Sequence, residues 1–106
     1  IKNMVTRQAA INMAKTFVQE CKESGLHLTD AFLFGSVVKN TQHESSDIDV
    51  VLVSENFTDN IFENLRLFSK INIKYPLIEV HPYSPESFLE ATDFIQEISK
   101  YKIALN

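Results

Sequence analysis

Two aspartates separated by a single residue, Asp47 and Asp49, stand at the start of an apolar run that continues to Val53. If residues 47 to 53 form a β-strand, both carboxylates point to the same side, about 6.6 Å apart along the strand. Like charges at that separation repel by roughly 3 kcal/mol at an effective dielectric constant of 20. A divalent cation would remove this repulsion, and Mg²⁺ prefers carboxylate oxygens. The pair therefore indicates a metal site at the beginning of a strand, the alternative being a pair that caps a turn.

A glycine and a serine, Gly35 and Ser36, follow another apolar segment, and ten residues separate Ser36 from Asp47. Glycine allows the backbone to approach a ligand closely, and the free N–H groups at the start of a helix attract phosphate. The Ser36 hydroxyl adds a donor. These two residues are typical of a phosphate-binding turn, although an ordinary glycine between a strand and a turn would give the same pattern.

A third acid, Glu79, lies inside the apolar run that extends from Leu77 to Val80. An acidic residue in such a segment is unusual unless one face of the strand is polar for a reason. If this strand lies beside the strand of Asp47 and Asp49, Glu79 can join them; the alternative is a solvent-facing glutamate on an edge strand. Three acids beside a phosphate-binding turn are what two-metal phosphoryl or nucleotidyl transfer requires, the third acid positioning an ion or taking a proton.

The elements that must position these residues follow from the apolar pattern. Apolar residues at three- and four-residue steps predict helices over residues 3–24 and 58–70 and from Pro85 to about residue 98. Continuous or alternating apolar residues predict strands over 30–35, 47–53 and 77–81. Residues 37–46 suit a short helical turn and a loop. This order predicts an α/β fold, a small sheet with helices packed on it.

The ends of the helices carry recognisable signals. Gly25 followed by Leu26 predicts the end of the first helix, and Thr58 is the expected N-cap of the second. Ser84 and Pro85 predict the start of the last helix. The expected buried stripes consist of Ile61, Leu65 and Phe68 in the second helix and of Phe88, Ala91, Ile95 and Ile98 in the last.

Composition narrows the class of protein. The chain has 106 residues, which we expect to form one domain over residues 1–106, and its 44% hydrophobic content with eight Phe excludes disorder. A net charge of −4 argues against a protein that coats nucleic acid. The single cysteine, Cys21, cannot form an intramolecular disulfide, which favours a cytoplasmic protein, and no apolar run approaches the roughly 20 residues of a membrane span.

The pattern Phe34-Gly35-Ser36, ten residues, then Asp47-Ile48-Asp49 resembles the signature of the polymerase-beta-like nucleotidyltransferase superfamily. The chain length and the segment from Ile78 to Phe88, in which a third acid precedes a proline-started helix, resemble its minimal (MNT) branch. The resemblance extends from about residue 8 to residue 99.

The resemblance implies a nucleotidyltransferase fold, with a mixed β-sheet flanked by helices, and transfer of AMP from ATP to a hydroxyl with two Mg²⁺ ions. It implies that Asp47 and Asp49 hold both metals and that Glu79 holds one and helps to deprotonate the acceptor. Gly35 and Ser36 would hold the triphosphate. Many MNT proteins accompany a HEPN-domain partner, and in such toxin–antitoxin pairs the MNT antitoxin adenylylates a tyrosine of the HEPN toxin.

The chain departs from the family pattern at two places. Where the family often has Gly-Ser-Arg-Ala-Arg-Gly, this chain has Val37 in place of the first basic residue and keeps only Lys39 as a phosphate-binding charge. The third acid is Glu79, where Asp is frequent. Both departures bear on activity more than on fold.

Three functional hypotheses therefore remain. The first is a Mg²⁺- and ATP-dependent nucleotidyltransferase whose acceptor is a partner protein, because so short a chain leaves little room for an acceptor-binding domain. The second, favoured by Val37, is a binding module that neutralises a HEPN partner by contact alone. The third is a stand-alone small-molecule or RNA nucleotidyltransferase, and the acidic net charge counts against RNA. A core this small is compatible with a homodimer, although one chain shows no interface.

Two histidines near these motifs have ordinary interpretations. His43, in the loop before Asp47, is expected to be a solvated loop residue. His81, after the third strand, is expected to have a structural or surface role rather than a catalytic one.

Overall fold

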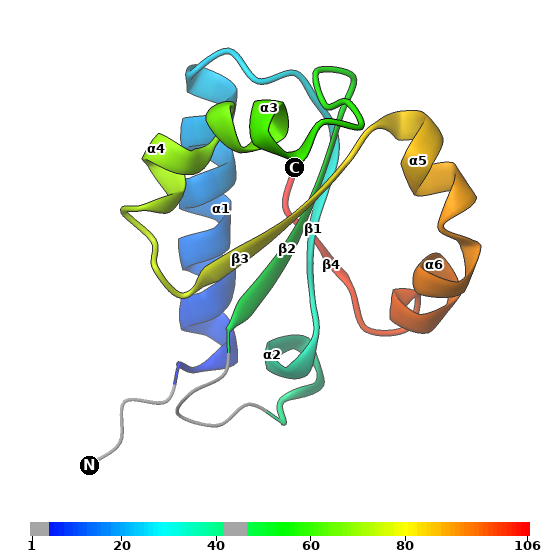
Figure 1. Cartoon of the computed structure of the whole chain (residues 1–106). Helices are drawn as coiled ribbons and strands as arrows, with labels where there is room; N and C mark the ends of the chain where they lie inside the picture. Colours follow the sequence, from blue (N-terminus) through cyan, green and yellow to red (C-terminus); the bar gives the residue numbers. More distant parts are fainter. Residues whose placement is uncertain (1–4, 42–46) are drawn as a thin grey trace.

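The computed structural model describes residues 5–41 and 47–106 and has a four-stranded mixed sheet at its centre, in the order β3-β2-β1-β4 (Figure 1). Strand β1 pairs antiparallel with β2 and with β4, whereas β2 and β3 are parallel. The elements in chain order are α1 (Arg7–Glu23), β1 (Leu28–Phe34), α2 (Ser36–Lys39), β2 (Ile48–Ser54), α3 (Ile61–Arg66), α4 (Ser69–Asn72), β3 (Ile78–Tyr83), α5 (Pro85–Glu90), α6 (Thr92–Ile98) and β4 (Ile103–Ala104). The predicted α/β class, with helices flanking a mixed sheet, is confirmed.

Helix α1 covers one face of the sheet. The Thr6 side chain caps its N-terminus by accepting a hydrogen bond from the backbone N–H of Ala9. At its other end Gly25 has φ +107°, and the N–H of Leu26 donates to the carbonyl of Cys21, so the predicted glycine C-cap is confirmed. The predicted start of this helix at residue 3 is wrong, because Thr6 is the N-cap and α1 begins at Arg7; residues 3 and 4 themselves lie outside the described part of the chain.

Alternation along β2 divides the core into two parts. Ile48, Val50 and Leu52 face α1 and are fully buried within the larger cluster of apolar side chains. Val51 and Val53 face the opposite side, where α5 and α6 lie (Figure 1), and belong to a smaller cluster rich in aromatic rings. The period of two therefore gives this strand one apolar face and one face that begins with Asp49.

The helix predicted over residues 58–70 is wrong in its start and its continuity. Asn60, rather than Thr58, is the N-cap, since its side chain accepts hydrogen bonds from the N–H groups of Phe62 and Glu63. The chain then leaves helical geometry at Phe68, whose φ is −139°, and α4 begins. This break buries the Phe68 ring. The predicted buried stripe is wrong at Ile61 and Leu65, which are 70% and 42% exposed, and right at Phe68.

The segment after β3 begins as predicted. Ser84 caps α5 with Pro85 at the first helical position, but the chain is non-helical at Ala91, where ψ is 54°, and continues as α6. Strand β4 was not predicted, since two residues paired with β1 leave no pattern in a sequence. None of the helices in the described residues has the length and apolar character needed to cross a membrane.

Candidate active site

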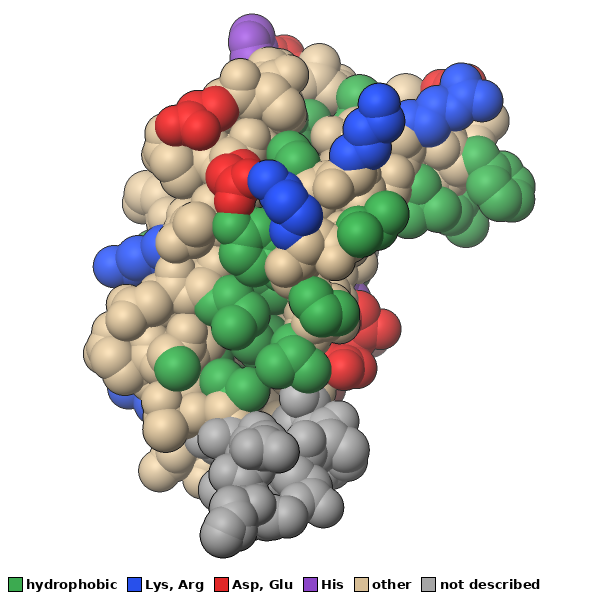
Figure 2. Space-filling model, turned by 90° about the vertical axis from the view of Figure 1, so that its left-hand side faces the viewer, with side chains coloured by type: hydrophobic (Ala, Val, Ile, Leu, Met, Phe, Trp, Pro, Cys, Tyr) green, Lys and Arg blue, Asp and Glu red, His purple; other side chains and the backbone are tan. Residues whose placement is uncertain are grey.

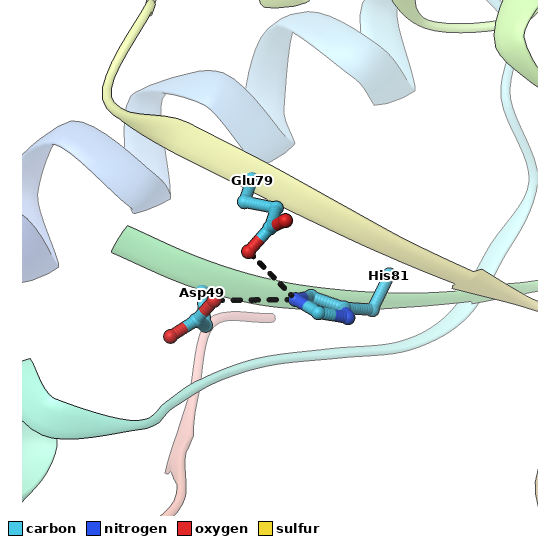
Figure 3. A group of neighbouring side chains, drawn as sticks. All are labelled: Asp49, Glu79 and His81. Carbon is cyan, nitrogen blue, oxygen red and sulfur yellow. Dashed lines mark hydrogen bonds and ion pairs between the residues drawn. The ribbon is translucent and has the colours of Figure 1, made fainter. Parts of the chain in front are cut away.

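Parallel pairing of β2 and β3 brings three chemically active side chains together. The register places Asp49 beside Glu79 and Val51 beside His81, so the three polar side chains share one face of the sheet. Nε2 of His81 lies 3.2 Å from Oδ1 of Asp49 and 3.6 Å from Oε1 of Glu79. Figure 3 shows the three side chains pointing toward one another, with one imidazole nitrogen facing both carboxylates. The sheet thus assembles a site from two strands that are distant in the sequence.

Gly35 lies against the carboxylate of Asp49, on the other side of β2 from Glu79. The backbone of β1 ends opposite Asp49, because Phe34 is its partner in the antiparallel register. A Cβ atom on Gly35 would overlap Oδ2 of Asp49 and lie 3.2 Å from its Cγ, and Gly35 has φ +88°. Both the space and the backbone conformation therefore require glycine here. The glycine of the predicted phosphate-binding turn and the second aspartate are in direct contact.

The close contacts within the cluster raise the pKa values of Glu79 and His81. A hydrogen bond with the Asp49 side chain is the main cause of the raised pKa of Glu79, and burial and the negative charges of Asp49 and Asp47 raise it further. His81 opposes this shift with its positive charge. The hydrogen bond to Asp49 in turn raises the pKa of His81, although burial of the ring acts in the opposite direction. The acids thus stabilise a proton or a cation between them.

Aromatic rings hold the imidazole of His81 in place. The ring of Phe34 packs edge-on against it, with ring centroids 4.9 Å apart. The ring of Phe94 in α6 packs edge-on against Phe34 in turn, with centroids 5.2 Å apart. Edge-to-face pairs of this kind restrict the ring orientation. The aromatic cluster beneath α5 and α6 therefore supports the polar site at its border.

The two predicted aspartates occupy different environments. The Asp49 side chain is 22% exposed, whereas Asp47 precedes β2 and is exposed. In the described residues, the potential ligand atoms that lie within 4.8 Å of one another come from Asp49, Glu79 and His81 and do not include Asp47. The charge of Asp47 nevertheless acts on Glu79, and both residues line the same groove. The structure therefore brings two of the three predicted acids together, with the third at the rim.

The remaining residues of the predicted phosphate-binding turn surround α2. Ser36 is the first residue of this short helix, directly after Gly35. The ammonium of Lys39 lies 5.4 Å from the centre of the Tyr101 ring, beside a small pocket of about 150 Å³ that Gly35 also lines. Val37, at the position where the family often has arginine, is buried in the core beneath α1. The turn thus presents the backbone of Gly35 next to Asp49, and Gly35 and Lys39 line the same small pocket.

A divalent metal ion fits the group formed by Asp49, Glu79 and His81. Two carboxylate oxygens and an imidazole nitrogen are ordinary ligands for divalent cations, and here they converge within 4.8 Å. A bound cation would also remove the repulsion that raises the pKa of Glu79. The donor set is therefore suitable for a metal, with Glu79 the most accessible of the three at 57% exposure.

The sequence alone does not place His81 in the site. The structure adds it, because its Nε2 contacts the carboxylates of both Asp49 and Glu79. The available signal was its position two residues after Glu79 in the same strand, which places both side chains on one face. His43 lies outside the described residues.

Comparison with known families explains why these residues are assembled. The profile of the nucleotidyltransferase domain matches residues 14–105, which is most of the chain and includes the glycine turn and all three acids. The chain belongs to the nucleotidyltransferase domain family. No curated protein is significantly similar to it in sequence.

Solved structures share the fold of this nucleotidyltransferase domain. A protein of Sulfolobus solfataricus assigned as a nucleotidyltransferase aligns with a TM-score of 0.69 and 19% identity, over 92% of this chain and 80% of the other. A chain of a toxin–antitoxin complex with AMP-PNP aligns with a TM-score of 0.64 and 22% identity, over 87% and 72%. A chain from the complex of the tri-AMPylated Shewanella oneidensis HEPN toxin with its MNT antitoxin gives 0.59 and 18%, over 91% and 71%. These likenesses show the nucleotidyltransferase fold that the sequence predicted.

Proposed function

We propose that this nucleotidyltransferase domain transfers AMP from ATP to a hydroxyl group of a partner protein, with Mg²⁺ as the cofactor. The observation that carries the proposal is the contact of Gly35 with Asp49 on one side, while Glu79 lies beside Asp49 on the other. A phosphate-binding turn and a pair of acids in contact are the parts that this transfer needs. Membership of the nucleotidyltransferase domain family supports the same reaction class.

The acids and the glycine turn would bind different parts of the substrate complex. Asp49 and Glu79 would hold the metal, with Asp47 joining from the rim to complete a site for two ions. When bound, such ions neutralise charge on the transferring phosphoryl group and on the leaving oxygen. Gly35 and Ser36 would bind the triphosphate, because Gly35 lies against Asp49 without a side chain in the way and Ser36 follows it at the start of α2. Lys39 would attract the end of the triphosphate that lies farthest from the acids.

The proton of the acceptor hydroxyl has a natural destination. The hydroxyl oxygen forms a bond to the α-phosphorus of ATP as the bond from that phosphorus to the bridging oxygen breaks and pyrophosphate leaves. Glu79 would take the proton, because it is the more exposed acid of the pair and lines the groove beside the site. His81 would hold Asp49 in its orientation through the Nε2 contact.

The proposal of a protein acceptor is supported by two observations. This nucleotidyltransferase domain shares its fold with chains of toxin–antitoxin complexes, in one of which the HEPN toxin is tri-AMPylated. A groove that is open to solvent also lies at the sheet edge beside Glu79, so a segment of a larger acceptor can reach this acid. We therefore propose a HEPN-domain protein as the partner and the cytoplasm as the place of reaction.

The test uses ATP labelled at the α-phosphate, Mg²⁺ and a HEPN-domain protein as the proposed acceptor. We expect label on the partner, and we expect Asp49→Asn to lower the rate by about 10²-fold or more, since it removes a charge that the transfer requires. Asp93→Asn is the matched control, because Asp93 is an exposed aspartate in α6, away from the cluster. Absence of label with the unaltered chain, in a complex that still forms, would contradict the proposal.

A second function is favoured by the glycine turn itself. Val37 is buried in the core and Lys39 lies over Tyr101, so the turn has less positive charge next to Asp49 than the family pattern implies. A domain with so weak a phosphate site could neutralise its HEPN partner by contact alone. In that case Asp49→Asn would leave both the complex and the neutralisation unchanged.

A further inference from the structure

A groove of about 650 Å³ runs along the outer edge of β3, beneath α3. Its walls are mainly apolar. The helical side contributes Ile61, Leu65 and Phe68, and the strand side contributes Ile78, Val80 and Pro82. Figure 2 shows hydrophobic side chains gathered across this side of the molecule and on a projecting lobe, with acidic side chains below the lobe at the same margin. An apolar hollow is thus open to solvent where the sequence predicted a buried helix stripe.

One end of the groove belongs to the candidate active site. Asp47 and Glu79 both line it, together with the apolar walls and a few other polar side chains. Gly35 does not line it, because Gly35 follows β1 and the sheet order places β2 between β1 and β3. The acids therefore lie between two openings, the glycine turn on the β1 side and the groove on the β3 side.

The geometry of phosphoryl transfer gives these two openings different roles. In an in-line displacement the attacking and leaving oxygens lie on opposite sides of the phosphorus. If the leaving pyrophosphate lies at Gly35 and Ser36, the attacking oxygen must arrive from the side of Glu79. The groove on that side is about as large as a small-molecule binding site, and Glu79 lines it.

The groove is better suited to bind side chains than to extend the sheet. The side-chain amide of Asn72 already donates to the carbonyl of Ile78, and Pro82 has no N–H to offer. Both features weaken the edge of β3 as a template for another strand. Ile61 and Leu65, by contrast, expose large apolar surfaces into the groove. Its acidic residues, Asp47, Asp59 and Glu79, favour a neutral or basic occupant.

We propose that this groove is the acceptor site, which binds a segment of the partner protein with apolar side chains against α3 and a hydroxyl group directed at Glu79. The proposal rests on the AMP transfer proposed above and adds the place and the chemistry of acceptor recognition. The occupant is a peptide segment in which apolar, neutral or basic residues flank the hydroxyl-bearing side chain.

A matched pair of isoleucines tests the groove. Ile61 lines it and is 70% exposed, whereas Ile73 is 77% exposed and lies outside it. Each is changed to Glu, which the first position of α3 tolerates because a negative charge is favourable at a helix N-terminus. The rate of AMP transfer to the HEPN-domain acceptor is measured as a function of acceptor and of ATP concentration. Leu65→Ser serves as a second groove variant, and thermal melts verify that each variant is folded.

We expect Ile61→Glu and Leu65→Ser to raise the KM for the acceptor about tenfold, with the KM for ATP unchanged, and Ile73→Glu to match the unaltered chain. Equal acceptor KM values for Ile61→Glu and the unaltered chain would overturn the groove proposal while leaving AMP transfer intact. A rise in the KM for ATP instead would assign the groove to the nucleoside and would also overturn it. If the unaltered chain transfers no label, the proposed function fails, and the acceptor role of the groove fails with it.

Discussion

The two faces of the sheet are built by the same strands and serve different ends. On the α1 face, Ile48, Val50 and Leu52 of β2 are completely buried and the apolar packing continues to the start of the strand. On the α5–α6 face, Val51 and Val53 are also buried, but the residue of β2 on this face nearest the start of the strand is Asp49, which is charged. One face is closed and the other ends at a charged site. The difference comes from two adjacent residues of β2, Ile48 on one face and Asp49 on the other. A small sheet can thus keep a continuous core on one face and expose a polar site at one end of the other.

The aromatic residues of the second face explain why the polar end is ordered. Phe34 contacts both His81 and Phe94, so the border between the aromatic cluster and the acids is a packed one. A polar site supported in this way can be altered with little loss of core packing. We expect substitutions on the two faces to separate stability from activity, and the following experiments test that separation from the largest expected effect to the smallest.

Truncating one aromatic ring on each face tests whether one face mainly supports stability and the other mainly supports activity. Phe17 is completely buried beneath the sheet in α1, so Phe17→Ala should lower the free energy of unfolding by about 3–5 kcal/mol. Phe94 is only partly buried, so Phe94→Ala should cost less stability but should lower AMP transfer by releasing Phe34 and His81. Urea denaturation and transfer rates measure both quantities. Equal losses of stability from the two variants would contradict a division of labour between the faces.

The two glycines with positive φ provide a sharper comparison. Gly35→Ala should cost about 1–3 kcal/mol of stability and most of the activity, because its Cβ would overlap the Asp49 carboxylate in addition to straining the backbone. Gly25→Ala is the matched control, since Gly25 has φ +107° but has open space where a Cβ would be placed. Thermal unfolding measures the loss of stability and transfer assays measure the loss of activity. Gly25→Ala shows the effect of backbone strain alone, and the additional effect of Gly35→Ala comes from the overlap with Asp49. If Gly25→Ala lowers activity as much as Gly35→Ala does, the contact with Asp49 has no functional meaning.

Metal binding at the polar site should stabilise the folded domain. A divalent cation at ten times its dissociation constant should add about 1.4 kcal/mol to the free energy of unfolding, which raises Tm by several degrees for a domain of this size. Mg²⁺ and Mn²⁺ are added separately, and Tm is followed by circular dichroism. Asp49→Asn should abolish the shift and Asp93→Asn should retain it. A shift that persists in Asp49→Asn would place the metal elsewhere.

The smallest expected effect concerns the link between α1 and the chain before β3. Glu20 accepts hydrogen bonds from Lys74 and Tyr75, and the bond from Lys74, followed by that from Tyr75, lowers its pKa below 4.5. A lowered folded-state pKa means that this link stabilises the fold above pH 4.5 and that its contribution is lost as the pH falls through the folded value. Melting temperatures between pH 7 and pH 3 should therefore show a modest acid-sensitive part that Glu20→Gln removes. Exposed pairs of this kind contribute little, so an unchanged profile in Glu20→Gln would show that the link is dispensable.

Much of the fold could be predicted because its signals are local. The period-two pattern of residues 48 to 53, the Gly25 C-cap and the Ser84-Pro85 helix start each depend on a few neighbouring residues, and the structure confirms them. The break at Phe68 could not be predicted, since the buried position of its ring depends on contacts with distant elements. Strand β4 was missed for the same reason, as its two residues are defined by their pairing with β1.

The candidate site followed a similar division. The spacing of Gly35, Asp49 and Glu79 indicated the chemistry, and the sheet register brings these residues together. The different exposures of Asp47 and Asp49 were not visible in the sequence, because the D-x-D pattern does not show where a strand begins. The role of His81 required the side-by-side pairing of β2 and β3, which periodicity alone cannot supply.

The mixed character of the sheet also has a consequence for how the site arises during folding. The antiparallel pairing of β1 with β2 is enough to place Gly35 against Asp49, whereas Glu79 and His81 arrive only with the parallel pairing of β3. Parallel pairs require a crossover connection, here through α3 and α4, and such long-range contacts form slowly. Docking of β3 is thus the step that completes the ligand set, and the appearance of metal affinity during refolding would time that step.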